Sequence, residues 1–375
     1  MIYILLPFIL FFFVFLEQIK ISKKNSFILC FFVVCIEILF FGSRYKVGVD
    51  WQNYVNYFKT LDESYRFEIG YYLINVIFKF IGLNYWAISF FASFIFSITL
   101  FATIWKKVPF PILFLALYFM INMLNQIEAV RSLIAYSIIL YSLQQVILGR
   151  YLKALIFSCF SILFHQTMIV FIPCIFLYNK KISNGYFFTL LFIGLFLYAI
   201  NISPINALLT ELSNYFFKDR LQHYLLIQTD GKYESVLSVT LIIKIIIFSA
   251  ITLFKKKLDK KYIKNPSFNV FYNIGAGYIL IYVYMLNEPA IIYRLSDLFV
   301  IGFIATICFF INFLNELNKK IVILGILVIS LLIYNSPFSD KYYQNYIINY
   351  TSFLSLIFSN EKESYNVNSY WNNPK

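Results

Sequence analysis

The chain has 375 residues, of which 61% are hydrophobic and 13% are charged, about half the charged fraction of an ordinary soluble domain. A soluble core cannot bury that much apolar surface, so the composition excludes an ordinary soluble protein and indicates an integral membrane protein. Its formal net charge is +13. All five Cys residues lie within apolar runs, and neither they nor the two His residues have the spacing of a metal site, so we expect no metal and no cofactor.

Apolar runs of spanning or near-spanning length recur along the chain. They lie at 1–16, 27–42, 85–105, 109–124, 128–148, 186–200, 236–254, 268–286, 295–314 and 321–335. Residues 151–178 are too long for one upright span and marginal for two, which predicts a short hairpin or a broken helix. The predicted fold is all-α, a polytopic transmembrane helical bundle of about 10–12 spans.

Basic residues concentrate in six short connections and set the expected orientation. These connections carry more than half of the 31 Lys and Arg residues and lie at 19–24, 105–107, 149–153, 179–181, 255–264 and 318–320. Because short basic loops stay on the cytoplasmic side, all six are expected there. The positive charge is therefore a topology signal, and we do not expect nucleic acid as a partner.

This orientation places three segments on the outer side, at 43–84, 201–235 and 287–297. Residues 68–84 are amphipathic and too short to span comfortably, so they predict an interfacial helix at the outer leaflet. We expect residues 1–335 to form a single integral-membrane domain. The C-terminal segment 336–375 is partly apolar and then polar, and its end is expected to be disordered.

Ionisable side chains fall at the predicted outer ends of several spans, where charges are expensive and often functional. They are Arg44, Asp50, Glu128, Arg131, His165, Arg294 and Asp297. Glu128 and Arg131 are three residues apart, which predicts that they share one helix face, and the same holds for Arg294 and Asp297. Each pair could simply satisfy itself, and the segment around Asp50 could be an aromatic belt with incidental charges.

The functional alternative is that these side chains converge on one extracytoplasmic cavity. Arginine forks onto phosphate oxygens, aromatic faces contact sugar rings, and apolar surface suits a polyprenyl tail. That combination fits a lipid-linked sugar diphosphate. The expected substrate-binding residues are Arg44, Arg131, Arg294, Glu128, Asp297, Trp51, Tyr54 and Tyr293.

Four motifs in chain order resemble the EpsG family, relatives of the Wzy-type O-antigen and capsule polymerases. The first is R-x-x-x-G-x-D-x-x-x-Y-x-x-x-F, from Arg44 to Phe58. The others are Glu128 to Arg131 followed by Ile134-Ala135, Phe164-His165-Gln166-Thr167 leading to Pro173, and Tyr293-Arg294. The chain departs from the family where Ser132 follows Arg131, because Arg-Gln is frequent there.

The resemblance implies a polymerase that joins undecaprenyl-diphosphate-linked oligosaccharide units into a surface polysaccharide, such as an O-antigen, a capsule or an exopolysaccharide. It implies a multi-pass protein of the bacterial cytoplasmic (inner) membrane, with its active site facing the periplasm or exterior. Besides the lipid-linked substrate and the bilayer, a flippase and a chain-length regulator are expected partners.

In the expected mechanism, Arg131 and Arg294 hold the diphosphate, with Arg44 as a third candidate. Asp50 or His165 accepts the proton of the attacking hydroxyl. The sequence slightly favours Asp50 as this base, with His165 then contacting sugar or phosphate. The alternatives are a flippase or transporter of lipid-linked oligosaccharide, an O-antigen ligase, a membrane acyltransferase and a structural scaffold.

Overall fold

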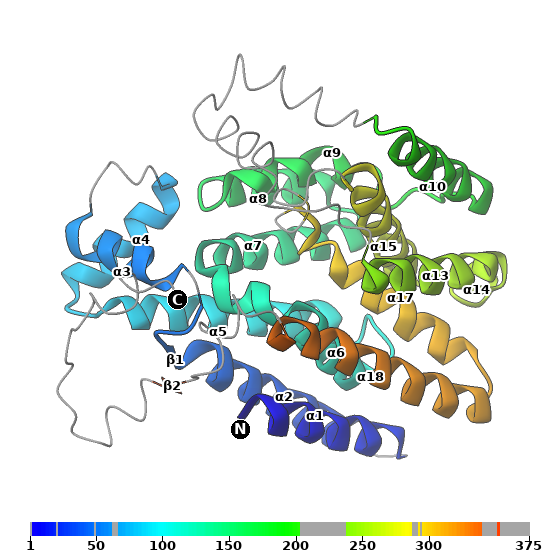
Figure 1. Ribbon diagram of the computed structural model, residues 1–375, viewed down its shortest axis with the longest axis horizontal. Coiled ribbons are helices and arrows are strands. Elements are labelled where there is room, and N and C mark those ends of the chain that lie inside the picture. Colours follow the sequence, from blue (N-terminus) through cyan, green and yellow to red (C-terminus); the bar gives the residue numbers. More distant parts are fainter. Residues whose placement is uncertain are drawn as a thin grey trace.

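The computed structural model describes residues 2–19, 22–48, 50–61, 67–202, 238–286, 292, 295–339 and 351–352. Within them the chain is almost entirely helical, and the helices pack side by side into a bundle (Figure 1). Five of these helices are long and apolar enough to cross a membrane. The prediction of an all-α polytopic membrane protein is confirmed.

The first half of the bundle follows the predicted spans closely. Its long helices are α1 (Ile2–Gln18), α2 (Lys23–Gly42), α5 (Tyr85–Ile104), α6 (Pro111–Glu128) and α7 (Val130–Ile147). Side chains of Ser22 and Asn84 cap α2 and α5, and Pro111 opens α6 in the first turn, where a missing backbone N–H costs nothing.

Between α2 and α5 lie the short strand β1 (Arg44–Tyr45) and the helices α3 (Trp51–Thr60) and α4 (Ile69–Phe80). One face of α4 is exposed and apolar, with Leu73 and Ile77 about half exposed, and its other face buries Tyr71 and Asn75. This is the amphipathic helix that the sequence predicts near 68–84.

The second half begins with the predicted broken segment. It consists of α8 (Tyr151–Ile162), the 3₁₀ helix η2 (Gln166–Val170) and α9 (Phe171–Ile175). The remaining helices are α10 (Asn184–Ala199), α13 (Val239–Leu253), α14 (Lys255–Lys261), α15 (Pro266–Tyr284), α17 (Val300–Phe313) and α18 (Glu316–Ser339). The strand β2 (Thr351–Ser352) follows, inside the segment that the sequence assigns to the C-terminal tail.

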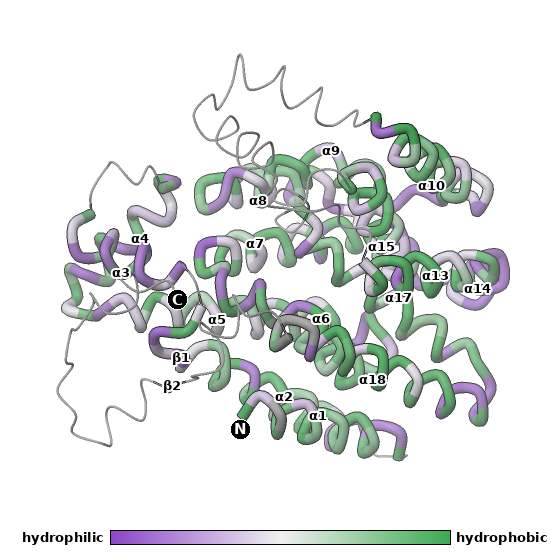
Figure 2. Tube along the Cα trace, in the orientation of Figure 1, coloured by the Kyte–Doolittle hydropathy of each residue, from purple (hydrophilic) through white to green (hydrophobic). Residues whose placement is uncertain are grey.

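The two ends of the bundle differ in character. The connections α5–α6, α7–α8 and α17–α18, together with α14, lie at the right-hand end in Figure 1, whereas β1, α3 and α4 lie at the opposite end. In Figure 2 the helices are mostly hydrophobic along their lengths, and α14 at one end and α3 at the other are markedly hydrophilic. These basic connections therefore lie at the end of the bundle opposite β1, α3 and α4.

A glycine pair forms a close helix contact in the second half of the bundle. A methyl group added at Gly275 of α15 would lie 2.9 Å from the backbone carbonyl of Gly302 in α17. Small residues at such contacts let two membrane helices approach closely. The two backbones thus touch where any larger side chain would separate them.

We expect Gly302→Val to destabilise the folded protein by about 1–3 kcal/mol or more, because the added side chain must push α15 and α17 apart. The detergent-purified protein is heated and the fraction that remains folded is measured by size-exclusion chromatography. The thermal midpoint of this loss should drop clearly. Gly325→Val in α18 is the matched control, since nothing lies within 4 Å of a methyl group there. An equal effect of both substitutions would contradict close packing at Gly302.

Candidate functional site

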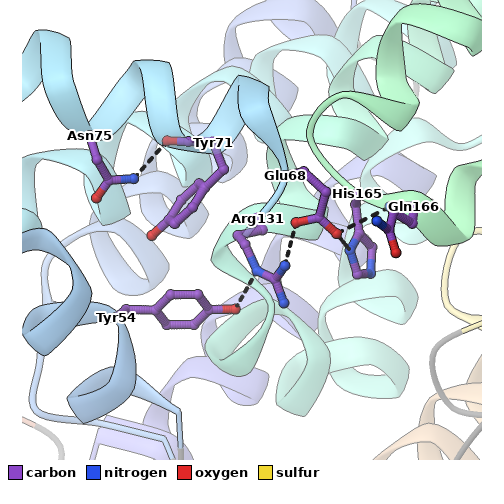
Figure 3. Close-up of polar contacts among 7 residues, drawn as sticks. All are labelled: Tyr54, Glu68, Tyr71, Asn75, Arg131, His165 and Gln166. Carbon is purple, nitrogen blue, oxygen red and sulfur yellow. Dashed lines mark hydrogen bonds and ion pairs between the residues drawn. The ribbon is translucent and has the colours of Figure 1, made fainter. Parts of the chain in front are cut away.

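A glutamate at the start of α4 lies at the centre of a buried polar group. Glu68 precedes α4 in extended backbone conformation, and its side chain makes no hydrogen bond to the helix that it begins. Instead it extends toward α7 and the turn after α8, where Arg131 and His165 are found (Figure 3). The Glu68 side chain is 5% exposed, so its charge depends on these partners.

A close backbone approach brings α4 to this position. The N–H of Gly70 donates to the carbonyl of Leu163 at 2.7 Å, and a methyl group at Gly70 would lie 2.9 Å from the Phe164 ring. Only glycine fits between α4 and the turn that carries His165. The Glu68 carboxylate is thereby fixed relative to His165.

Arg131, in the first turn of α7, is held from three directions. Its Nη1 donates to Glu68 Oε2 at 2.5 Å, and its Nε donates to the Tyr54 hydroxyl at 3.4 Å. Its guanidinium carbon lies 4.4 Å from the centre of the Phe67 ring, a cation–π contact. The side chain remains 16% exposed. The guanidinium is therefore oriented before any substrate binds, and part of it remains accessible to a ligand.

His165 lies beside the other carboxylate oxygen of Glu68. Its Nδ1 is 3.5 Å from Glu68 Oε1, and the same oxygen accepts the backbone N–H of Gln166 at 3.3 Å. A carboxylate on the Nδ1 side favours the tautomer in which Nδ1 carries the proton and Nε2 holds the lone pair. This arrangement suits a histidine that accepts a proton at Nε2.

The ionisation of Glu68 follows from these contacts. Burial raises the pKa of Glu68, but the close contact with His165 and the positive charge of Arg131 outweigh it, so that the pKa falls from its ordinary 4.5 to about 2. Glu68 is therefore a carboxylate throughout the physiological pH range. It can hold a positive charge on Arg131 and stabilise one on His165.

This lowered pKa predicts an acid-dependent stability. Because the folded state holds the proton less tightly than the unfolded chain, Glu68 contributes stability above pH 4.5 that is lost as the pH falls from 4.5 toward 2. We expect the thermal midpoint of the wild type to fall more steeply below pH 4.5 than that of Glu68→Gln, which has no such proton. Parallel curves for the two proteins would contradict the lowered pKa.

An aromatic cluster surrounds the Arg131 side of the site. The Tyr54 ring stacks on those of Phe67 and Tyr85, with centroids 5.7 and 6.1 Å apart, and Tyr71 packs against its edge. Tyr54 is only 6% exposed. Tyr54 thus contacts Arg131, and the cluster helps to hold the guanidinium, whereas the half-buried Trp51 packs against Trp86.

The first motif of the sequence lies next to this cluster. Arg44 is buried and donates to the Phe41 carbonyl and to Ser93 Oγ. Asp50 precedes α3 and is half-buried. Arg44, Asp50 and Glu128 all lie within electrostatic range of Tyr85, whose ring stacks on Tyr54. Tyr85 thus links the surroundings of these three residues to Tyr54, which accepts the hydrogen bond of Arg131.

The expectation that Glu128 and Arg131 share one helix face is wrong. Glu128 is the last residue of α6, and Ala129 leaves the helical conformation with φ −98° and ψ 54° before α7 begins. The chain turns at Ala129, so the spacing of three residues does not place the two side chains on one helical surface. Glu128 lies against Gly48, whose added methyl group would be 3.4 Å from its Oε1.

Asp297 takes part in a neighbouring polar group. It accepts a hydrogen bond from Asn125 of α6, and Asn125 also donates to Asn122 at 2.8 Å. Asn122 breaks the helical geometry of α6 and donates to the Tyr118 hydroxyl at 2.9 Å. Asp297 is thus joined to the end of α6 that leads to Arg131. Tyr293, Arg294 and residues 203–235 of the predicted outer segment 201–235 lie outside the described residues.

Two residues of the site do not stand out in the sequence. Glu68 resembles an ordinary acid before an amphipathic helix, and Gly70 resembles a helix glycine. The only available signal is the pattern Glu-Ile-Gly at 68–70 at the edge of a predicted outer segment. Across the described ranges, no three His, Cys, Asp or Glu side chains gather as a metal site would.

Comparison with known proteins gives a family but no individual relative. The EpsG family matches residues 27–352, which include Glu68, Arg131 and His165. No curated protein and no solved structure matches the chain.

Proposed function

The chain belongs to the EpsG family, a family of membrane proteins with a polysaccharide-polymerase type of function, and on that basis we propose that it polymerises undecaprenyl-diphosphate-linked oligosaccharide units on the outer face of the bacterial cytoplasmic membrane. The single observation that carries the proposal is the arrangement of Arg131 and His165 on the two oxygens of Glu68. A cation for a diphosphate and a base for a hydroxyl are the two groups that such a transfer needs.

The outer-face placement rests on charge. Described basic connections lie at the bundle end opposite α3, α4 and β1 (Figure 1), and positively charged short loops remain in the cytoplasm. The Glu68 group is built from α4, the start of α7 and the turn after α8, all at the end away from those connections. Lipid-linked units that have crossed the membrane would meet the site there.

The reaction is a glycosyl transfer with a diphosphate leaving group. A hydroxyl oxygen of the acceptor unit forms a bond to the anomeric carbon of the donor glycan. The bond from that carbon to the diphosphate oxygen breaks, and the polyprenyl diphosphate leaves with the electron pair. Arg131 stabilises the negative charge that grows on the leaving oxygen, since guanidinium binds phosphate in bidentate geometry.

His165 accepts the proton of the attacking hydroxyl at Nε2. Glu68 holds the ring through Nδ1 and stabilises the imidazolium that forms, as a buried carboxylate beside histidine does in other acyl- and group-transfer sites. The geometry at Glu68 favours His165 over Asp50 as the base, which reverses the slight preference drawn from sequence. Asp50, at the edge of the aromatic cluster, is then assigned to orienting a sugar.

Deletion of the gene and analysis of the surface glycan on a ladder gel test this function. A polymerase leaves single repeat units attached to the surface and removes the ladder of longer chains. Loss of all surface glycan would instead indicate a ligase or flippase. An unchanged ladder would overturn the proposal.

A further inference from the structure

The only strand pair among the described residues joins the first motif to the C-terminal part of the chain. Arg44 pairs with Ser352 and Tyr45 with Thr351 in an antiparallel register. The two strands lie side by side at the end of the bundle that holds α3 and α4 (Figure 1). A segment more than 300 residues later in the sequence thus covers the turn that begins the site.

The strand pair is anchored to α2 through side chains. Ser352 donates from its hydroxyl to Ser43 Oγ at 2.9 Å, and Ser43 in turn donates to the Leu39 carbonyl at 2.5 Å. Arg44 is 3% exposed and donates to Ser93 of α5. The C-terminal strand therefore pairs with a turn whose side chains are hydrogen-bonded to α2 and α5.

The same turn connects to the Arg131 group. The Tyr45 ring lies 4.6 Å from Trp86, which contacts Tyr85 at 5.1 Å, and Tyr85 stacks on Tyr54. Tyr54 accepts the Arg131 hydrogen bond. A displacement of β1 would thus shift the packed rings and, through them, the guanidinium of Arg131. Such contiguous packing is a physical route for coupling.

The limits of the family match agree with this arrangement. The match ends at residue 352, the last residue of β2, and leaves out the remaining C-terminal residues. The shared part of the chain therefore includes the strand that closes on β1.

We propose that Thr351 and Ser352 form a positioning strand of the site: by pairing with Arg44 and Tyr45, they hold the first motif in place against the Arg131 group. The expected effect of the strand on glycan length rests on the proposed polymerase function. The pairing of the two strands does not depend on that function. It also places residues 351–352 on the same side of the membrane as the site.

A pair of truncations tests the positioning role. A chain that stops after residue 353 keeps the strand, and a chain that stops after residue 350 lacks it. We expect the first to give a wild-type glycan ladder and the second to lose polymer by 10-fold or more at equal membrane level. Equal ladders, or loss of polymer from both chains, would overturn the inference.

Two substitutions separate positioning from folding. Ser352→Ala removes the hydroxyl that donates to Ser43, and Ser352→Thr retains one. We expect a several-fold lower turnover per folded molecule for Ser352→Ala, with the thermal midpoint unchanged, and rescue by Ser352→Thr. An equal loss in both variants, or no loss in either, would contradict a role for this hydrogen bond.

Disulfide formation tests the strand pair without reference to activity. In Tyr45→Cys/Thr351→Cys the two cysteines occupy paired positions of the register, and an oxidant should join them. A protease site inserted within 203–237 lets a gel show whether the two halves stay linked, with each single cysteine variant as a control. Absence of the link would overturn the inference, whereas a link combined with a wild-type protein that makes no polymer would count only against the proposed function.

Discussion

Replacing His165 with glutamine is expected to abolish polymerisation, whereas Asp50→Asn retains most of it. A positioned base contributes roughly 100- to 10,000-fold to a transfer reaction, and glutamine can fill the space of histidine without accepting the proton. His165 is 3.5 Å from a carboxylate that orients it, whereas Asp50 immediately precedes α3. The measurement is the glycan ladder of a deletion strain that carries each variant.

The control for this comparison is the amount of folded protein. Both variants should reach the membrane at wild-type level and elute as the wild type does on size-exclusion chromatography. A full ladder in His165→Gln together with its loss in Asp50→Asn would transfer the base role to Asp50. A full ladder in both would remove the base from this site altogether.

Glu68→Gln is expected to lower the rate about 100-fold or more. The amide keeps the size of the side chain but carries no charge. Its NH₂ group must face either Arg131, which donates to Glu68, or His165, whose Nδ1 lies 3.5 Å from it. One of these two groups then faces an NH₂ group in place of a carboxylate oxygen, and the ring and the guanidinium lose the negative charge that they share. Turnover per folded molecule measures the effect.

The matched control is Asp259→Asn. Asp259 also pairs with a buried cation, Lys255, at 2.7 Å, but it lies in α14 at the opposite end of the bundle (Figure 1). Its loss should leave polymerisation unchanged. If Asp259→Asn impaired the ladder as much as Glu68→Gln does, the effect would reflect a general loss of buried ion pairs and the special role of Glu68 would be refuted.

The spans could be predicted from the sequence because their signal is local. A run of apolar residues such as 85–105 has to form a helix in lipid, where each backbone polar group needs an internal partner. The observed helix Tyr85–Ile104 agrees closely. The broken segment at 151–178 was also predictable, since its length suits neither one span nor two.

The centre of the site could not be found in this way, because its contacts are distant in sequence. Arg131 meets Glu68 across 63 positions, and no residue spacing encodes such a contact. The opposite error affects Glu128 and Arg131, whose local spacing indicates a shared helix face. The helix breaks at Ala129, although no proline or glycine there indicates a break in the sequence. Tertiary packing therefore overrides the local helical pattern at this position.

The assignment of Arg44, Arg131 and His165 to one region was predictable from the topology alone. Each follows or precedes a span at the end away from the basic connections; the structure brings Arg131 and His165 together on Glu68 and places Arg44 in β1, at the same end of the bundle. Which of them touch, and through which carboxylate, depends on the close approach at Gly70 and on the packed tyrosines.

The most direct test of the central claim uses purified protein in liposomes with a synthetic polyprenyl-diphosphate-linked repeat unit. Mass spectrometry follows the lipid products over time. We predict that the wild type forms glycans of two or more units on one polyprenyl diphosphate and releases one free polyprenyl diphosphate for each new linkage, and that His165→Gln and Glu68→Gln form neither product at a comparable rate. Wild-type protein that moves the lipid across the bilayer without joining units, or variants that join them at the wild-type rate, would contradict the account.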